Sequence, residues 1–231
     1  MSKETNAITH PSPLPREFYD RDVRDVAREL LGKLIVRRSR EGATLGRIVE
    51  TEAYLPQGDS ACHAVAGSNR KTAAIFGPPG TAYVYVIHAR HCFNTVADAE
   101  GTGCAALIRA VHPLAGMSLM RQRRGRDAVR DLARGPARLC EAFAIDRQFN
   151  GWDLTKGRSL FIAEARDQPE IRDAVCEILT TPRIGVTSAA DLPLRYIFAD
   201  NQYISGPKKL NVAGPSSAKG QTHSMSLAIR S

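Results

Sequence analysis

Two glutamates and a tyrosine alternate along a short stretch that otherwise has the composition of a buried strand. Residues 48–64 read IVETEAYLPQGDSACHA. Side chains alternate between the two faces of a strand, so Glu50, Glu52 and Tyr54 would share one face, and His63 follows nine residues later. Glutamate is depleted in strands. The pattern therefore indicates either a carboxylate used in acid–base chemistry or the wet face of an edge strand paired with arginines.

A second strand-like segment, residues 81–88 (TAYVYVIH), places two tyrosines on one face. Tyr83, Tyr85 and Ile87 share that face by the same alternation. Two aligned aromatic rings can stack on a planar ligand, and they can equally be core residues whose hydroxyls reach the rim. The pattern alone leaves both interpretations open.

Histidine and cysteine gather in residues 88–94 (HARHCFN), just after this segment. With Cys62 and His63 they could be imagined as metal ligands, but the spacing matches no ordinary zinc pattern. The five cysteines of the chain are odd in number and include no CxxC pair. We therefore predict free thiols, with neither a disulfide framework nor a structural metal site.

Arginine is concentrated in residues 120–139 (MRQRRGRDAVRDLARGPARL), where two aspartates offset only part of the charge. The formal net charge of the chain is +8 and its pI is near 9.5, and such a surface attracts nucleic acid. The segment is either a phosphate-contacting surface or a solvated helix face, and the net charge favours the first. Its arginines are Arg121, Arg123, Arg124, Arg126, Arg130, Arg134 and Arg138.

The chain has the length and composition of one sizeable domain, with 231 residues, 43% hydrophobic and 24% charged. No apolar run reaches the roughly 18 residues needed to span a bilayer, and the N-terminus has no apolar stretch of signal-peptide type. We therefore expect a cytoplasmic protein, nucleoid-associated if it binds DNA. Residues 1–14 are expected to be a flexible segment and residues 207–231 a tail around one domain, residues 15–206.

The elements expected to position these residues are more often strands than helices, and the two do not alternate. This order favours an α+β fold over a Rossmann-type fold. A buried helical stripe follows Phe18 and ends at Gly32, and residues 56–80 form a long loop of the kind that is often functional. Strands are predicted at 33–39, 43–55, 81–88, 104–113, 158–164, 182–186 and 193–205, and helices at 18–32, 114–125 and 135–145.

Several segments, taken in order, resemble one known family. RIVETEAYL, ACHA, FGPPGTAYVYVIHARHCFN, GCAALIRAVHPLAGM, GPARLCEAFAI, PRIGV and PLRYIF are similar to segments of the alkyladenine (3-methyladenine) DNA glycosylases of mammalian type. The similarity covers roughly residues 15–206 in the right order. Several matches in register are far more specific than any single one of them.

The resemblance implies a monofunctional glycosylase that flips a damaged purine out of double-stranded DNA and hydrolyses its bond to deoxyribose, leaving an abasic site for base excision repair. Family substrates include 3-methyladenine, hypoxanthine and ethenoadenine. The implied protein is a monomer with no cofactor and no membrane partner. Its single α+β domain would hold a curved, mainly antiparallel sheet flanked by helices, like the C-terminal domain of formyltransferases.

The matches imply roles for residues that handle water. Glu52 matches the carboxylate that positions and deprotonates the attacking water, and Arg109 matches the arginine beside that water. The backbone carbonyl of Ile184 is expected to complete the cage. Glu50 has no part in this scheme, and we expect it to form a structural salt bridge.

A second set of matches implies a base-binding pocket. Tyr54, His63 and Tyr85 match the residues that stack on the extruded base, and His63 is also placed to hydrogen-bond its edge. Asn94 matches the asparagine that crowds the 2-amino group of guanine. Tyr83 matches a tyrosine near the pocket mouth.

The segment after the tyrosine strand departs from the family pattern. Members usually carry a tyrosine there, followed by Gly-Met, as the wedge that replaces the flipped base, whereas IHARHCFN is one residue shorter. His88 is the best match for the wedge and Ile87 the alternative, because planar and apolar wedges both work.

A non-catalytic lesion-binding protein is the alternative function, and a metal-dependent hydrolase is a third. Retention of Glu52 and Arg109 argues against the binder.

Overall fold

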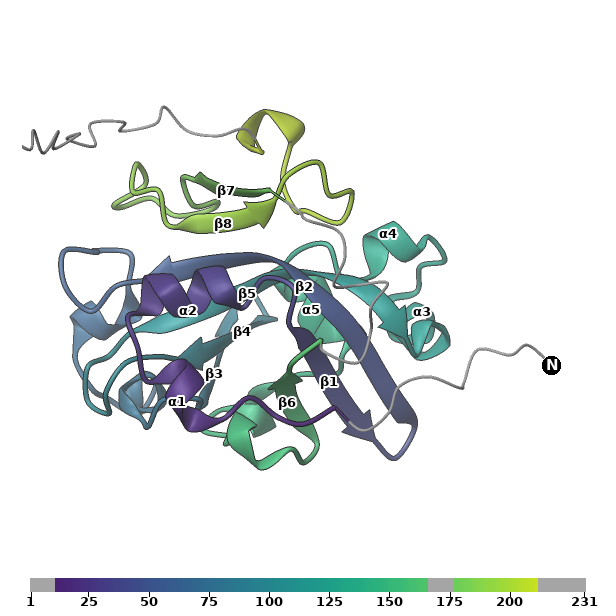
Figure 1. The fold of residues 1–231 in the computed structure, drawn as a ribbon, viewed down its shortest axis with the longest axis horizontal. Coiled ribbons are helices and arrows are strands. Elements are labelled where there is room, and N and C mark those ends of the chain that lie inside the picture. Colours follow the sequence, from purple (N-terminus) through teal and green to yellow (C-terminus); the bar gives the residue numbers. More distant parts are fainter. Residues whose placement is uncertain (1–10, 166–176, 212–231) are drawn as a thin grey trace, which may run out of the picture.

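The computed structural model describes residues 11–165 and 177–211. Their strands form one antiparallel sheet in which β3, β4, β5, β2, β1 and β6 are neighbours in that order, while β8 joins β2 and pairs with β7 (Figure 1). The strands are β1 (Leu34–Ser39), β2 (Gly42–Tyr54), β3 (Ala82–Ile87), β4 (Arg90–Val96), β5 (Ala105–Ala115), β6 (Leu160–Ala163), β7 (Ile178–Thr181) and β8 (Arg195–Phe198).

Short helices pack against this sheet. Helix α2 contacts β2 and β5, and α5 contacts β4 and β5 (Figure 1). The α-helices are α1 (Arg16–Tyr19), α2 (Val23–Glu29), α3 (Met117–Arg124), α4 (Val129–Leu132) and α5 (Pro136–Ala142), and the 3-10 helices are η1 (His63–Ala66), η2 (Ala73–Phe76), η3 (Arg147–Phe149), η4 (Leu154–Lys156) and η5 (Lys208–Leu210). The α+β class expected from the sequence is confirmed.

Strand β2 is an interior strand of the sheet, with paired strands along both of its edges. One edge pairs with β5 along almost the whole strand. The other edge pairs with β1 up to Arg47 and then, from Glu50 to Glu52, with β8. In Figure 1, β8 and β7 lie above the far half of β2. The second half of β2 is therefore paired on both edges, and residues 48–53 are all buried.

The first predicted helix, residues 18–32, is in fact two helices. The chain breaks at residues 20–22, where the Asp22 carboxylate accepts a hydrogen bond from the N–H of Arg24 and caps α2. The predicted apolar stripe is confirmed, because Val23, Val26 and Ala27 are buried. Gly32 ends the segment with φ +86°, a conformation that glycine adopts without steric cost.

The prediction was wrong for the last strands. Residues 182–186 form no strand, because the N–H of Ile184 bonds to a side-chain carboxylate and not to a neighbouring strand. Only Arg195–Phe198 of the predicted 193–205 strand forms β8. Two strands, β4 and β7, were not predicted. Strand β4 lies between β3 and β5, and β7 pairs with β8. Neither strand has a clear alternation of buried and exposed residues.

The packed part of the chain extends beyond both predicted domain limits. Leu14, placed in the flexible segment, is 1% exposed, and its N–H bonds to the carbonyl of Ile162. At the other end, η5 and Asn211 belong to the predicted tail, yet Asn211 accepts a hydrogen bond from a buried arginine, Arg195. Residues 1–10 and 212–231 of these segments lie outside the described residues.

Candidate active site

The two glutamates of β2 are fully buried. Glu50 lies opposite Ala110 of β5 and Ile197 of β8, and Glu52 is paired on both sides in the same way. Each side chain is 0% exposed. The alternative of a solvent-exposed edge strand is therefore wrong, but the pairing with arginines that it included is present. Carboxylates in this position need charged partners, because an unpaired buried charge is costly.

Arg109 supplies a charge to both glutamates because the β2–β5 register is irregular at this point. Glu50 pairs with Ala110 and Thr51 with Ile108, so Arg109 is skipped in the pairing. Bulges of this kind turn a side chain out of its regular direction and are common beside active sites. The guanidinium of Arg109 reaches Glu50 Oε1 at 3.1 Å from Nε and Glu52 Oε1 at 3.2 Å from Nη1.

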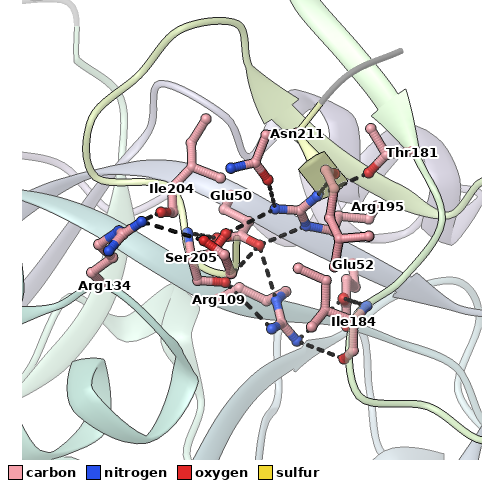
Figure 2. Close-up of polar contacts among 12 residues, drawn as sticks. Glu50, Glu52, Arg109, Arg134, Thr181, Ile184, Arg195, Ile204, Ser205 and Asn211 are labelled. Atoms are coloured by element: carbon pink, nitrogen blue, oxygen red, sulfur yellow. Dashed lines mark hydrogen bonds and ion pairs between the residues drawn. The ribbon is translucent and has the colours of Figure 1, made fainter. Parts of the chain in front are cut away.

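Glu50 is the centre of a buried ionic network (Figure 2). Its Oε1 accepts hydrogen bonds from Arg109 Nε, Arg195 Nε (2.6 Å) and the Ser205 hydroxyl (2.9 Å), and Oε2 accepts from the Ser205 N–H (2.7 Å). Burial alone would raise the pKa of Glu50, but Arg109, Arg195 and the Ser205 N–H together lower that pKa below its ordinary value. Glu50 thus forms a buried salt bridge with Arg109 and Arg195, as expected.

Arg195 extends this network to the end of the described chain. Its guanidinium donates to the Thr181 hydroxyl at 3.0 Å, to the Leu210 carbonyl at 2.9 Å and to the Asn211 side chain at 2.8 Å (Figure 2). The side chain is 0% exposed. Strand β7, strand β8 and the segment around η5 are therefore held together behind Glu50 by one cation.

Glu52 has a different set of partners, one of which, Tyr54, lines a pocket. Its Oε1 accepts from the Ile184 N–H at 2.8 Å and contacts Arg109, and its Oε2 accepts from the Tyr54 hydroxyl at 2.9 Å. Arg109 Nη1 also donates to the Ile184 carbonyl at 3.2 Å. A carboxylate has about four acceptor positions, and these contacts use three. Glu52 can therefore accept one more donor on Oε2, beside Tyr54.

The pocket next to Tyr54 is lined mainly by aromatic side chains. His63 Nδ1 and the Tyr83 hydroxyl are 2.8 Å apart, and the His63 and Tyr85 ring centroids are 4.5 Å apart at 68°. Asn94 donates to the Tyr83 carbonyl at 2.9 Å. The structure thus brings together all five residues that the sequence assigned to a base pocket. The complete lining is Tyr54, Ala61, His63, Ile75, Tyr83, Tyr85, Asn94 and Ala105.

The protonation states of these rings suit an aromatic, polar ligand. Desolvation lowers the pKa of His63, so its imidazole is neutral at pH 7. Burial raises the pKa of Tyr83 to about 12, and burial also raises the pKa of Tyr54 and of Tyr85. Each phenol therefore stays protonated. Electron-rich, uncharged rings of this kind can stack on a cationic heterocycle without charge repulsion.

Comparison with known proteins identifies the family that carries this site. The profile of the methylpurine-DNA glycosylase family matches residues 17–202. The chain belongs to the methylpurine-DNA glycosylase family. It is 44% identical over 193 residues to a protein of Carboxydothermus hydrogenoformans (83% of this chain, 98% of that protein) and 43% identical over 209 residues to one of Koribacter versatilis (89% and 99%).

A protein of Methanoculleus marisnigri is 45% identical over 193 residues (83% of this chain, 98% of that protein). The names of all three relatives provisionally assign them as 3-methyladenine DNA glycosylase. Membership of the methylpurine-DNA glycosylase family makes the chain a DNA glycosylase, with DNA as its partner. This agrees with the resemblance noted from the sequence segments.

The two residues predicted as wedge candidates, Ile87 and His88, lie at the hairpin between β3 and β4. Its two-residue turn is His88–Ala89, with φ +46° and +58°, a conformation usually taken by Asn-Gly. Ile87 precedes the turn and is 50% exposed, and Val86 is 44% exposed. Ile87 shares its face with the pocket tyrosines Tyr83 and Tyr85, whereas His88 lies in the turn itself.

The arginine-rich segment has a mainly structural part in the described residues. Arg123, Arg124 and Arg130 donate to carbonyls or carboxylates of neighbouring segments. Arg134 donates to the carbonyls of Ile204 (2.6 Å) and of residue 206 (Figure 2). Arg130 and Arg134 therefore hold the 202–206 segment, which presents the Ser205 backbone to Glu50, whereas Arg123 and Arg124 bond to other neighbouring segments. Contact of this arginine-rich segment with phosphate stays a prediction.

Four residues packed around the site were not anticipated from the sequence: Arg195, Ser205, and the buried ion pair of Arg183 with Asp59, in which the Arg183 guanidinium lies over the Tyr54 ring. A cation inside the apolar strand LRYIF was the available signal for Arg195, because buried arginines are almost always paired. Nothing local distinguished the others. In the described part of the chain, no three His, Cys, Asp or Glu side chains are grouped to hold a metal ion, and no helix there could cross a bilayer.

Proposed function

We propose that this methylpurine-DNA glycosylase is monofunctional and excises alkylated or deaminated purines, namely 3-methyladenine, hypoxanthine and ethenoadenine, by hydrolysing the N-glycosidic bond. The single observation that carries the proposal is the buried carboxylate of Glu52, joined by the Tyr54 hydroxyl to an aromatic pocket. A base in the pocket would hold its sugar near the carboxylate. The product is an abasic site in double-stranded DNA.

In the proposed reaction, Glu52 is the general base. Its remaining acceptor position on Oε2 takes a proton from the attacking water, while the Ile184 carbonyl, 3.2 Å from Arg109 Nη1, accepts from the same water. The Arg109 guanidinium, 3.2 Å from Glu52 Oε1, holds the carboxylate in place. The carboxylate also stabilises the oxocarbenium-like charge that develops on the sugar. A cationic alkylpurine leaves readily, whereas hypoxanthine, which is neutral, needs more assistance.

In the pocket, Tyr54, His63 and Tyr85 stack on the extruded base. Ring planes on either side of a base must be about 7 Å apart, twice the usual contact distance of about 3.5 Å. The His63 and Tyr85 centroids are 4.5 Å apart, so these rings separate when a base is inserted. Asn94 lies at the base edge, where it crowds the 2-amino group of guanine, and Tyr83 lies near the mouth.

Ile87 is the wedge that we favour over His88. It continues the face of the pocket tyrosines toward the hairpin tip, and the residue is 50% exposed. An aliphatic side chain can fill the gap left by a flipped base, because apolar wedges insert between base steps. His88, in the turn, is then placed to contact the backbone or the opposite strand.

The test is base release from defined substrates. End-labelled duplexes with one hypoxanthine or one ethenoadenine are incubated with the protein in EDTA and treated with hot alkali, and release of 3-methyladenine from methylated DNA is followed in parallel. We expect lesion-specific breaks only after alkali. Breaks before alkali would mean a lyase activity, and dependence on metal would support the hydrolase alternative.

Glu52→Gln separates catalysis from binding. We expect the single-turnover rate constant to fall by about 10²–10⁴-fold, with the affinity for lesion duplex nearly unchanged. Glu29→Gln, on the exposed side of α2, is the matched control and should excise normally. Equal loss of both excision and binding in Glu52→Gln would instead make Glu52 structural. A wild-type protein that binds lesions but releases no base would favour the non-catalytic binder.

A further inference from the structure

Two charged side chains with no part in the proposed reaction are buried beside the pocket. Arg183 and Asp59 have side chains that are 0% exposed, and they form a bidentate ion pair with distances of 2.6 Å (Nη1–Oδ2) and 2.7 Å (Nη2–Oδ1). A two-point pair of this kind fixes geometry as well as charge. Because buried ion pairs contribute little net stability, the importance of this pair lies in what its geometry positions.

Asp59 controls the turn that connects two of the stacking residues. Its carboxylate accepts from the N–H of Leu55 at 3.0 Å and from the N–H of Ala61 at 3.1 Å. Leu55 directly follows Tyr54, and Ala61 lies two residues before His63. The backbone between the two rings is therefore folded around one carboxylate.

Arg183 contacts the same wall from outside the pocket. Its guanidinium lies over the Tyr54 ring, with 4.6 Å from Cζ to the centroid. It also donates to the Ala53 carbonyl at 3.0 Å and to the Ala189 carbonyl at 3.2 Å. Arg183 is not among the lining residues of the pocket, so it supports Tyr54 from behind. The ring cannot recede when a base stacks on it.

Arg183 is also the neighbour of Ile184, whose backbone N–H and carbonyl contact Glu52 and Arg109 (Figure 2). No strand pairing holds this stretch, because residues 182–186 have no regular structure. Its position depends on side-chain bonds, and the strongest of these is the ion pair between Arg183 and Asp59. The same pair thus acts on the base wall and on the carbonyl that would hold the water.

We propose that Asp59 and Arg183 are positioning residues that couple base stacking to water placement. The pair holds Tyr54 and Ile184 at fixed separation, so that a base seated on Tyr54 has its sugar in line with the water at Glu52. This inference rests on the proposed function, because it assigns the pair a part in that reaction. A displacement of about 1 Å in such an arrangement can reduce a rate about 100-fold.

The experiment compares four variants by single-turnover excision, lesion-duplex affinity and thermal unfolding. Asp59→Asn and Arg183→Lys each weaken the pair. The double variant Asp59→Asn/Arg183→Gln removes both charges and so leaves neither one buried alone. Glu164→Gln, which breaks the partly exposed ion pair between Lys33 and Glu164 at 2.8 Å, is the control and should excise as the wild-type protein does.

We expect each pair variant to excise about 10–100-fold more slowly than the wild-type protein, with a smaller loss of affinity. Arg183→Lys should retain the most activity of the three. The double variant is decisive: its unfolding midpoint should recover toward that of the wild-type protein relative to Asp59→Asn, while its excision rate stays at least about tenfold low.

A double variant that excises at the wild-type rate would overturn the inference, as would pair variants that all fail to fold, since the pair would then be only structural. Rates that fall strictly in proportion to the folded fraction would overturn it also. A wild-type protein that releases no base would overturn the proposed function and this inference with it. Normal wild-type excision combined with an unaffected double variant overturns this inference alone.

Discussion

Replacing Glu50 by glutamine tests the buried network from its centre. In the wild-type protein two carboxylates, Glu50 and Glu52, face two guanidinium groups, Arg109 and Arg195, and all four side chains are at most 8% exposed. Glutamine has the same shape but leaves one positive charge without a partner. One of its two polar atoms is an NH₂ group, which cannot accept from the Ser205 N–H or from the arginines.

The magnitude of the effect follows from the burial. Removing one partner of a buried ion pair costs about 3–5 kcal/mol, and each kcal/mol lowers the unfolding midpoint of a chain of this size by about 2–4 °C. We therefore expect the midpoint of Glu50→Gln to fall by roughly 6–20 °C. Arg109, freed on one side, should also position Glu52 less well, so excision should slow by about tenfold or more.

The stabilising contribution of Glu50 depends on pH. Burial by itself would raise the pKa of Glu50, but Arg109 and Arg195 lower the pKa of the folded state below the ordinary value of 4.5. The contribution of Glu50 is therefore fully present above about pH 4.5 and is lost as the pH falls through the folded-state pKa. The difference in unfolding free energy between wild type and Glu50→Gln should be largest at neutral pH and should shrink in acid.

Urea unfolding at about pH 7 and at successively lower pH measures both quantities. Ser205→Ala is the matched control, because it removes one hydroxyl from the same carboxylate and keeps the backbone N–H bond. It should cost only about 1 kcal/mol. The reasoning is refuted if Glu50→Gln costs less than Ser205→Ala, or if its cost is the same at every pH.

Two further predictions concern the ends of the site. Truncation after Gly206 removes the Leu210 and Asn211 acceptors of Arg195 and should lower the unfolding free energy by about 1–3 kcal/mol. Truncation after Asn211 keeps both acceptors and should not lower it. Equal losses of unfolding free energy in the two truncated proteins would contradict a stabilising role of these two acceptors. Ile87→Ser should weaken binding to lesion duplex by about tenfold, and His88→Ala should weaken it less. Both affinities are measured by fluorescence anisotropy in a Glu52→Gln background. A larger loss of affinity in His88→Ala would make His88 the wedge.

Local patterns predicted the elements whose structure depends on neighbours in sequence. The apolar stripe of α2 and the strands β1, β2 and β3 were all confirmed, because residue periodicity acts over a few positions. Alternation also placed Glu52 and Tyr54 on one face, where their side chains are hydrogen-bonded. The candidate pocket followed from the resemblance of short segments.

Strand limits near the end of the chain were not predictable in this way. The apolar run at 182–186 favours a strand, yet this stretch is held by the Arg183 side chain and by Glu52. Apolar character alone does not tell whether a backbone N–H will meet a neighbouring strand or a buried carboxylate. For the same reason β7 was not predicted from the sequence. In the described part of the chain this strand pairs only with β8.

By itself, then, the sequence determined which side chains could do chemistry and on which face of β2 they lie. Only the tertiary structure decided their charge partners. Glu50 meets Arg195 and Ser205, which are 145 and 155 residues away along the chain, and Arg109 reaches both glutamates only because the register slips beside it. Partners of a buried charge are chosen by where distant strands pair, and that depends on the packing of the whole sheet.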